Sequence, residues 1–223
     1  MANNLSVTNL FDVAGRWIVI TGAAGGIGYM IARGCAANNA NVVLIDIDES
    51  TLLKAKAELE KAFPSSKVTI IPGDLSSEEG VKTVADSIKT QIDSVDALFN
   101  CAAIRYMNEI TYQPGGGLSK LEAATLSAPY KGWEHTFRLN VLAPYYLTAH
   151  LISHLGAAAA KGDGRGCVVL FSSPASVHNH QFVPCYQTSK AAVDHLVRIM
   201  AMEFAEPYSK ISPGANSDVE NMF

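Results

Sequence analysis

The sequence has few of the features that mark a nucleic-acid-binding, membrane-spanning or secreted protein. Its 17 Lys and Arg face 21 Asp and Glu, and the net charge of −4 comes without any basic block, which argues against binding to nucleic acid or to an anionic membrane. No apolar run approaches the ~18 residues of a membrane-spanning helix. The polar stretch Met1–Asn9 has no secretory pattern. We therefore expect a cytoplasmic protein with neither nucleic acid nor membrane as partner.

Cysteine pairs are absent as well. The four cysteines are scattered, without a Cys-x-x-Cys pair, at Cys35, Cys101, Cys167 and Cys185. This pattern does not suit a disulfide framework or a zinc site, so we expect reduced thiols and no bound metal. What the 223 residues do have is 48% hydrophobic and only 17% charged residues. That composition and length predict one folded domain with a substantial core.

Short apolar segments alternate with longer segments of helical character along the chain. The short segments predict strands at 16–21, 41–45, 68–71, 97–100 and 167–172, and the long ones predict helices at 29–38, 49–63, 77–91, 133–155 and 186–204. Repeated β-α alternation implies an α/β fold with one doubly wound, Rossmann-type parallel sheet and helices on both faces. We expect residues 1–223 to form this single domain, with an inserted loop at 112–130 and another loop at 156–166.

A glycine-rich turn separates the first predicted strand from its helix. Gly22, Gly26 and Gly28 would let a dinucleotide pyrophosphate approach the N–H groups at the helix N-terminus, where the helix dipole favours negative charge. Asp46, at the end of the second strand, could accept hydrogen bonds from both adenosine ribose hydroxyls and would repel a 2′-phosphate. No Arg or Lys lies in the turn or just after Asp46, which favours NAD over NADP. The alternative is a tight strand-to-helix turn with incidental glycines.

The spacing Thr-Gly-x-x-x-Gly-x-Gly from Thr21 to Gly28 resembles that of the short-chain dehydrogenase/reductase family. Further motifs follow in the family's order over residues 14–214. The segment 100–103 reads Asn-Cys-Ala-Ala where the family has Asn-Asn-Ala-Gly, and Tyr-x-x-x-Lys ends at Lys190. The other matching positions are Asp74 after the third strand, Asn140 in a helix, Ser173 thirteen residues before Tyr186, and Pro213-Gly214.

The resemblance implies a site for NAD and a small-molecule alcohol or ketone. The implied catalytic residues are Asn140, Ser173, Tyr186 and Lys190. The implied cofactor contacts are Thr21, Gly22, Gly26, Ile27, Gly28, Asp46, Asp74, Leu75, Asn100, Ala102, Tyr186, Lys190, Pro213 and Gly214. The resemblance also implies that Lys190 binds the nicotinamide ribose hydroxyls and that Asn140 holds a water molecule in a proton relay.

The residue types suit hydride transfer coupled to proton transfer. Lys190 lies four residues after Tyr186, so both project from one helical face, and an ammonium close to a phenol favours the phenolate. Ser173 could donate a hydrogen bond to the substrate oxygen and stabilise developing alkoxide character. Each residue also has a structural alternative: a chance Tyr-x-x-x-Lys, a serine that ends a strand, and an asparagine with buried partners.

The pattern departs from the family after residue 206. Only Lys210–Ser212 remains for a shortened sixth strand, and the seventh strand and the substrate-covering helices are missing. Two explanations stay open: an incomplete product of a longer dehydrogenase, or a natural short form whose cover comes from a partner subunit or from the segment 112–130. The pocket residues that we expect are apolar, namely Tyr106, Trp133 and Phe182.

The expected function is an NAD-dependent oxidoreductase that interconverts a secondary alcohol and a ketone. The resemblance further implies a homodimer or homotetramer that associates through the helices at 133–155 and 186–204. Two other functions stay open. One is a catalytically silent relative that binds NAD as a sensor or scaffold, and the other is a redox-neutral enzyme, such as an epimerase or lyase, that keeps NAD as a helper.

Overall fold

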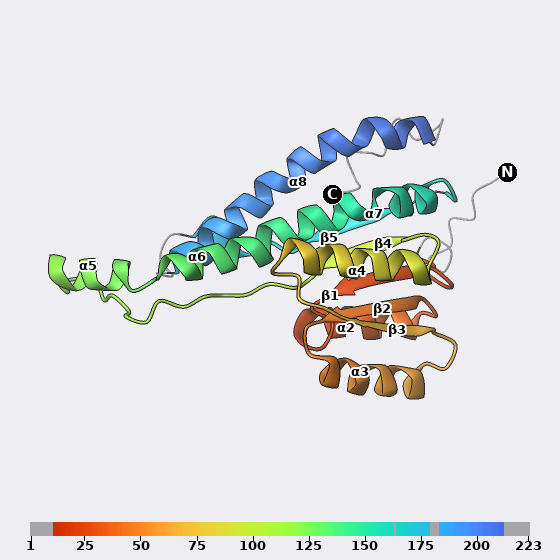
Figure 1. The fold of residues 1–223 in the computed structure, drawn as a ribbon, viewed down its shortest axis with the longest axis horizontal. Helices are drawn as coiled ribbons and strands as arrows, with labels where there is room; N and C mark the ends of the chain where they lie inside the picture. Colours follow the sequence, from red (N-terminus) through yellow and green to blue (C-terminus); the bar gives the residue numbers. More distant parts are fainter. Residues whose placement is uncertain (1–10, 163, 179–182, 212–223) are drawn as a thin grey trace.

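The computed structural model describes residues 11–162, 164–178 and 183–211 (Figure 1). Five parallel strands form a sheet in the order β3-β2-β1-β4-β5. They are β1 (Trp17–Thr21), β2 (Asn41–Asp46), β3 (Val68–Pro72), β4 (Ala97–Asn100) and β5 (Cys167–Leu170). The strand order reverses between β1 and β4, which is the point where open α/β sheets bind ligands beyond their carboxyl ends. The predicted α/β fold with a single parallel sheet is confirmed.

Helices cover both faces of the sheet. Inward-facing residues of α2 (Gly26–Ala37) and α3 (Glu49–Ala62) pack with Ile20 and Leu44 on one face. On the other face, α4 (Glu78–Gln91) and α7 (Ala143–Ala159) pack against Val19, Val43 and Ile45. Alternate residues of the central strands thus enter two separate cores, because successive side chains of a strand point to opposite faces. This double burial explains why the strands are continuously apolar in sequence.

The helix predicted at 133–155 is interrupted. α6 (Tyr130–Phe137) leads into a π-helical turn, η1 (Arg138–Leu142), before α7 begins. Pro144 supplies a physical reason: it has no amide hydrogen for the carbonyl of Asn140, four residues earlier, and its ring disfavours regular helix at that point. The prediction of one unbroken helix was wrong because it did not weigh this proline.

Two predicted loops contain helix. The segment 112–130 was predicted as an inserted loop, but it contains α5 (Leu118–Leu126), at one end of the molecule in Figure 1. Its three glycines mark only where the helix begins, since Gly117 has a φ of +83° and the nine residues that follow include neither Gly nor Pro. In the predicted loop 156–166, α7 continues to Ala159 through helix-favouring alanines.

The helix α8 (Pro184–Ile211) runs beside α7 (Figure 1). Lys210 and Ile211, two of the three residues expected to remain of a sixth strand, are the last residues of α8 instead. The third, Ser212, lies outside the described residues, as do the predicted contacts Phe182, Pro213 and Gly214. No helix in the described ranges is long and apolar enough to cross a membrane.

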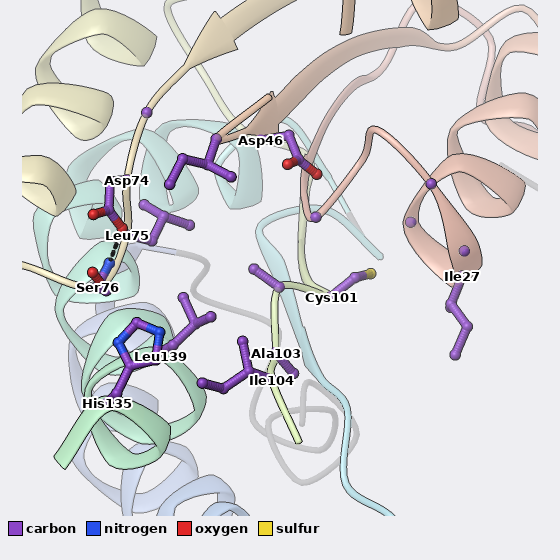
Figure 2. A pocket seen from close by; sticks show the side chains of 17 residues that line it. Ile27, Asp46, Asp74, Leu75, Ser76, Cys101, Ala103, Ile104, His135 and Leu139 are labelled. Atoms are coloured by element: carbon purple, nitrogen blue, oxygen red, sulfur yellow. Dashed lines mark hydrogen bonds between the residues drawn. The ribbon is translucent and has the colours of Figure 1, made fainter. Parts of the chain in front are cut away.

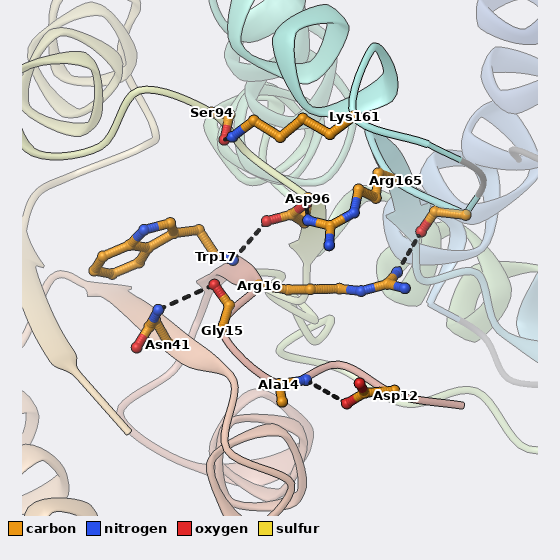
Figure 3. Close-up of polar contacts among 11 residues, drawn as sticks. Asp12, Ala14, Gly15, Arg16, Trp17, Asn41, Ser94, Asp96, Lys161 and Arg165 are labelled. Atoms are coloured by element: carbon orange, nitrogen blue, oxygen red, sulfur yellow. Dashed lines mark hydrogen bonds and ion pairs between the residues drawn. The ribbon is translucent and has the colours of Figure 1, made fainter. Parts of the chain in front are cut away.

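The amino ends of the strands are joined by Asp96, which is 3% exposed (Figure 3). Its carboxylate accepts a hydrogen bond of 2.7 Å from the backbone N–H of Trp17 and pairs with Arg165 at 2.6 Å. Its backbone carbonyl accepts from the N–H of Cys167 at 3.0 Å. One buried acid therefore connects β1, β4 and β5 at the edge away from the ligand crevice.

Candidate functional site

A pocket of about 700 Å³ lies at the carboxyl ends of the strands (Figure 2). Figure 2 shows Asp46 and Asp74 toward one end of it and Ile104 toward the other. Its lining includes most of the predicted cofactor residues: Gly22, Gly26, Ile27, Gly28, Asp46, Asp74, Leu75 and Ala102. The structure thus brings together residues from four separate turns, as the switch point of the sheet requires.

The glycines of the turn fall into two kinds: some allow close backbone packing, and others face open space. Gly22 has a φ of +64°, and a Cβ there would come within 2.9 Å of the Ala102 backbone; a Cβ on Gly28 would meet the carbonyl of Gly22. These two glycines let the turn, the helix and the loop after β4 pack closely. Gly25 and Gly26 instead face open space, with no atom within 4 Å of the point where a Cβ would lie.

The N-terminus of α2 is open to an anion. Gly25 is its N-cap and provides no side-chain hydrogen bond, whereas Asp48 and Ser77 cap α3 and α4 with side-chain oxygens. The first N–H groups of α2 therefore face the pocket without a protein cap. Such N–H groups, together with the helix dipole, are what a pyrophosphate needs.

Asp46 ends β2 beside this turn. Its Oδ2 accepts a hydrogen bond of 3.0 Å from the N–H of Ala24, and its Oδ1 accepts one of 3.3 Å from the N–H of Asp48. An ionised carboxylate has about four acceptor sites, so about two remain for ribose hydroxyls. Thr21, by contrast, does not line the pocket: it is buried and accepts from the N–H of Ala102 at 3.0 Å, which positions the loop after β4.

Asn140 lies in the π-helical turn and holds that same loop. Its Oδ1 accepts from the N–H of Ile104 and its Nδ2 donates to the carbonyl of Ile104, both at 2.9 Å. The Nδ2 also donates to Ser189 Oγ of α8 at 3.0 Å. The side-chain amide, only 3% exposed, therefore has structural partners. Its backbone carbonyl has no N–H donor four residues later, because that residue is Pro144.

A second, much smaller cavity of about 10 Å³ adjoins Asn140, Pro144, Lys190 and Asn100. Its polar lining and its volume suit one water molecule. Asn100 is 8% exposed, and its Nδ2 has no hydrogen-bond partner among the described residues. Ala102 borders both this cavity and the large pocket. Asn100 was expected to contact the cofactor, but the structure places it at the smaller cavity.

Tyr186 and Lys190 share one face of α8, as predicted. The Lys190 Nζ lies 5.7 Å from the centroid of the Tyr186 ring and donates to the carbonyl of Phe171 at 2.6 Å. Burial lowers the pKa of Lys190, while the charges of Asp194 and Cys101 oppose that shift. Neither Tyr186 nor Lys190 lines the large pocket. Ala102, in the loop after β4, borders both the large pocket and the small cavity beside Lys190.

Ser173 precedes a short 3₁₀ turn, η2 (Pro174–Ser176), that packs against α8. Its Oγ accepts a hydrogen bond of 3.1 Å from the N–H of Ala175, so the hydroxyl proton stays available to a substrate oxygen. The Ser172 hydroxyl donates to the carbonyl of Lys190 at 3.4 Å. The hydroxyls of Ser172 and Ser176 also hold the pKa of the Asp194 carboxyl below its usual value. The turn that carries Ser173 is therefore fixed to α8 around Lys190 and Asp194.

Several pocket residues were not expected from the sequence. Cys101 lines the pocket, and burial raises the pKa of its thiol to about 12 against the opposing charge of Lys190. His135 and Leu139 also line it, and their spacing of four residues just before Asn140 is a signal that could have revealed them. Arg105 does not line this pocket, but its guanidinium carbon lies 5.9 Å from the Tyr186 ring centroid, and no sequence signal pointed to it.

Of the three residues expected in an apolar pocket, Tyr106 and Trp133 are described and Phe182 is not. Trp133 lines a shallow hollow with Tyr130, Glu134 and Phe137, and its ring stacks on Phe137 at 6.3 Å. The Tyr106 ring packs instead against Gly132. The two aromatic residues therefore face different surroundings. Of the four cysteines, Cys185 is buried and the other three are half-buried.

Comparison with known proteins gives this geometry a context. The family model described as short chain dehydrogenase matches residues 16–216. A very-long-chain 3-oxoacyl-CoA reductase-like protein of Arabidopsis thaliana is 29% identical over 86% of this chain and 56% of its own length. An NAD-dependent glycerol dehydrogenase of Listeria innocua is 30% identical over 89% of this chain and 68% of its own.

Among solved structures, L-sorbose reductase of Gluconobacter frateurii, complexed with NADPH and L-sorbose, superposes with a TM-score of 0.74 at 25% identity. The match covers 87% of this chain and 66% of that one. The chain thus spans between about half and two thirds of the length of these proteins. The family match over most of the chain, together with the sheet order and the glycine turn, shows that this protein belongs to the short-chain dehydrogenase family.

Proposed function

We propose that this protein is an NAD-dependent oxidoreductase that interconverts a secondary alcohol and a ketone. The observation that carries the proposal is the pair on α8: the buried Lys190 ammonium lies 5.7 Å from the Tyr186 ring, beside the loop that closes the nucleotide pocket. An ammonium this close to the ring places positive charge beside the group that would exchange a proton with the substrate oxygen.

The pocket residues fit a dinucleotide. The uncapped N-terminus of α2 would hold the pyrophosphate, and Asp46 would accept hydrogen bonds from the adenosine ribose. Relatives differ in cofactor, since the Listeria enzyme is named NAD-dependent and the sorbose reductase was solved with NADPH. Asp46 supports NAD for this chain, because its carboxylate would repel a 2′-phosphate.

The residues on α8 and in the turn before it would handle the proton and the substrate oxygen. Bound NAD supplies the hydride acceptor. As the carbinol C–H bond breaks, the Tyr186 phenolate takes the hydroxyl proton; in the reverse direction the phenol returns that proton to the ketone oxygen. The Ser173 hydroxyl, already oriented by Ala175, donates to the same oxygen and stabilises its negative charge.

Asn140 would serve the proton path through its backbone rather than its side chain. Pro144 cannot donate to the Asn140 carbonyl, and the 10 Å³ cavity that both residues line also borders Lys190. A water there would connect that carbonyl with the Lys190 ammonium and the unpaired Asn100 amide. The proposed relay thus depends on the interruption of the helix at the π turn.

We also propose that copies of this chain associate through α7 and α8. Leu142, the last residue of η1, and Tyr146 on α7 are 47% and 44% exposed. Ile199 and Met202 on α8 are 38% and 78% exposed. Such large apolar side chains on neighbouring helices favour burial against a second copy. Light scattering on the purified chain tests this assembly: a monomeric mass would contradict it.

The central experiment combines cofactor titration with turnover. Calorimetry with NAD and NADP should show NAD binding and weak or no NADP binding. A panel of secondary alcohols should then produce NADH. Tyr186→Phe should retain NAD binding and lose turnover by about 10²–10⁴-fold. The matched control, Tyr29→Phe, removes a surface hydroxyl that bonds Glu58 and should retain activity.

Each outcome separates the candidate functions. Turnover by Tyr186→Phe at the rate of the unmodified chain would remove Tyr186 from its assigned role. NAD binding without NADH formation on any alcohol would favour a silent relative or a redox-neutral reaction. Absence of NAD binding by the folded chain would overturn the proposal.

A further inference from the structure

Arg105 lies over the ring of Tyr186, the proposed catalytic tyrosine. It comes from a different part of the chain than Lys190, the other cation near that ring. Its guanidinium carbon is 5.9 Å from the Tyr186 ring centroid, and the Lys190 Nζ is 5.7 Å from the same point. Lys190 is buried in α8, whereas Arg105 is exposed in the loop after β4. A second cation thus sits at the solvent side of the group that would bind the substrate oxygen.

The loop fixes Arg105 in place by holding both of its neighbours. Ile104 exchanges two backbone hydrogen bonds of 2.9 Å with the Asn140 side chain. The carbonyl of Tyr106 accepts from the Cys185 thiol at 3.5 Å, and its ring packs against Gly132. The backbone that carries Arg105 is therefore tied to η1, α6 and α8. These contacts fix where the Arg105 side chain leaves the backbone, and its guanidinium lies over the Tyr186 ring.

Within the part of the chain that the structure describes, no carboxylate forms an ion pair with Arg105. The ion pairs found among the described residues are Lys56–Glu60, Lys82–Asp86, Lys89–Asp86 and Arg165–Asp96. Asp194, the acid on α8 nearest in sequence to Lys190, is held by the hydroxyls of Ser172 and Ser176. A guanidinium over an aromatic face keeps its in-plane N–H groups free, and those groups match the two oxygens of a carboxylate or phosphate.

Charge is also divided along the site. The carboxylates Asp46 and Asp74 line the pocket, whereas Arg105 and Lys190 lie outside its lining, 5.9 and 5.7 Å from the centre of the Tyr186 ring. An anionic substrate would be repelled by the first pair and attracted by the second. Fixed charges arranged in this way orient a ligand as well as attract it.

We propose that Arg105 binds a negatively charged group, a carboxylate or a phosphate, carried by the alcohol or ketone close to its reacting carbon. This inference rests on the proposed function, because Tyr186 defines where the reacting oxygen lies. It names a substrate class that the apolar residues Tyr106 and Trp133 did not indicate. The competing role for Arg105 is to assist ionisation of Tyr186, which would affect neutral and anionic substrates alike.

The test compares matched substrates that differ only in charge. The probes are 3-oxobutyrate against its methyl ester and dihydroxyacetone phosphate against dihydroxyacetone, each with NADH. The unmodified chain should favour one or both anions in kcat/KM by about 10- to 100-fold, in line with a charge-assisted hydrogen bond. In Arg105→Gln that ratio should fall toward one, mainly through KM, and Arg105→Lys should restore part of it. Arg33→Gln, which removes an equal charge from the exposed face of α2, should keep the full ratio.

Binding provides an arm that does not need turnover. Calorimetry would follow 3-oxobutyrate and dihydroxyacetone phosphate added to the NADH complex of Tyr186→Phe, with and without Arg105→Gln. Binding of either anion that is lost with Arg105→Gln supports the inference even if no probe is a substrate. The inference is overturned if neither anion binds, or if Arg105→Gln lowers kcat equally for both members of a pair and shifts the pH profile. Failure of NADH itself to bind would instead count against the proposed function.

Discussion

The two ends of the parallel sheet use polar residues in opposite ways. At the amino end, the Asp96 carboxylate is 3% exposed and satisfied by Trp17 and Arg165 (Figure 3). At the carboxyl end, the α2 N–H groups have no side-chain cap and the Asn100 amide has no partner among the described residues. Satisfied polar groups stabilise a fold, whereas open ones are available to a ligand. The comparison predicts that substitutions at the amino end change stability, and those at the carboxyl end change binding.

The largest stability effect should follow Asp96→Ala. It leaves the Trp17 N–H unpaired inside the protein and removes the partner of Arg165, and loss of one member of such a pair costs about 3–5 kcal/mol. The lower part of that range is expected, since the Arg165 side chain is 28% exposed and can be rehydrated. Urea unfolding measures the loss, and Asp96→Asn should lose less because it keeps an acceptor for Trp17. An NAD affinity that fell with stability, measured where the variant is folded, would contradict the separation.

The next effect concerns the thiols at the two ends of the sheet. The pKa of Cys101 is raised to about 12 because the thiolate would be desolvated, so below that pH the reactive thiolate fraction grows tenfold per pH unit. At pH 8 alkylation of Cys101 should be roughly a thousandfold slower than that of a free thiol. Peptide mass spectrometry after iodoacetamide treatment measures it.

Added NADH should slow the alkylation of Cys101 further, because Cys101 lines the nucleotide pocket. Cys167, at the amino end of β5, should be unaffected by NADH, although burial raises the pKa of its thiol too. Equal protection of both cysteines would show a global effect of the cofactor instead of contact at one edge.

The carboxyl end is also where a charge should decide the choice of cofactor. Asp46→Asn keeps an acceptor for the Ala24 N–H but removes the negative charge. The NAD:NADP affinity ratio should therefore fall by about 10- to 100-fold, the effect of losing a charged hydrogen bond and a repulsion. Calorimetry with both cofactors measures it. An unchanged ratio would show that Asp46 only anchors the turn.

The sequence predicted the first half of the chain more closely than the second. All strands from β1 to β4 lie where the apolar runs placed them, because buried parallel strands leave a strong local signal. The π turn was missed because a single proline outweighs the surrounding helical pattern. The helix α5 was missed because three glycines before it obscure its helical pattern. Local periodicity does not reveal how one residue redirects a backbone.

Some residues of the candidate site could likewise be predicted from the sequence, and others could not. The glycine turn and Asp46 followed from spacing, and the structure places them in one pocket. The position of Arg105 over Tyr186 could not be predicted, because the two residues are 81 positions apart. Hydrogen bonds to Asn140 and Cys185 hold the Arg105 loop against later helices. Contacts between distant residues depend on tertiary packing, which no local pattern in one sequence records.

The capped and uncapped helices offer a smaller test of the comparison. Ser77 caps α4 by accepting from the Gly80 N–H at 3.1 Å, and Ser77→Ala should cost about 1 kcal/mol of unfolding free energy. NAD affinity should stay the same, because Ser77 does not line the pocket. Thermal unfolding and NAD titration measure the two quantities on one sample. A clear loss of NAD affinity would mean that the start of α4 supports the pocket after all.

The smallest effect on stability is expected for Gly25→Ser, which should raise the stability of the fold and lower the affinity for NAD. Gly25 is the N-cap of α2, its φ of −169° suits any residue, and no atom lies within 4 Å of its Cβ position. Gly25→Ser should therefore add a cap and raise stability by a few tenths of a kcal/mol. The new hydroxyl would bond the N–H groups that the pyrophosphate needs, so NAD affinity should fall while stability rises. If both rose together, the open helix N-terminus would not be where the cofactor phosphates bind.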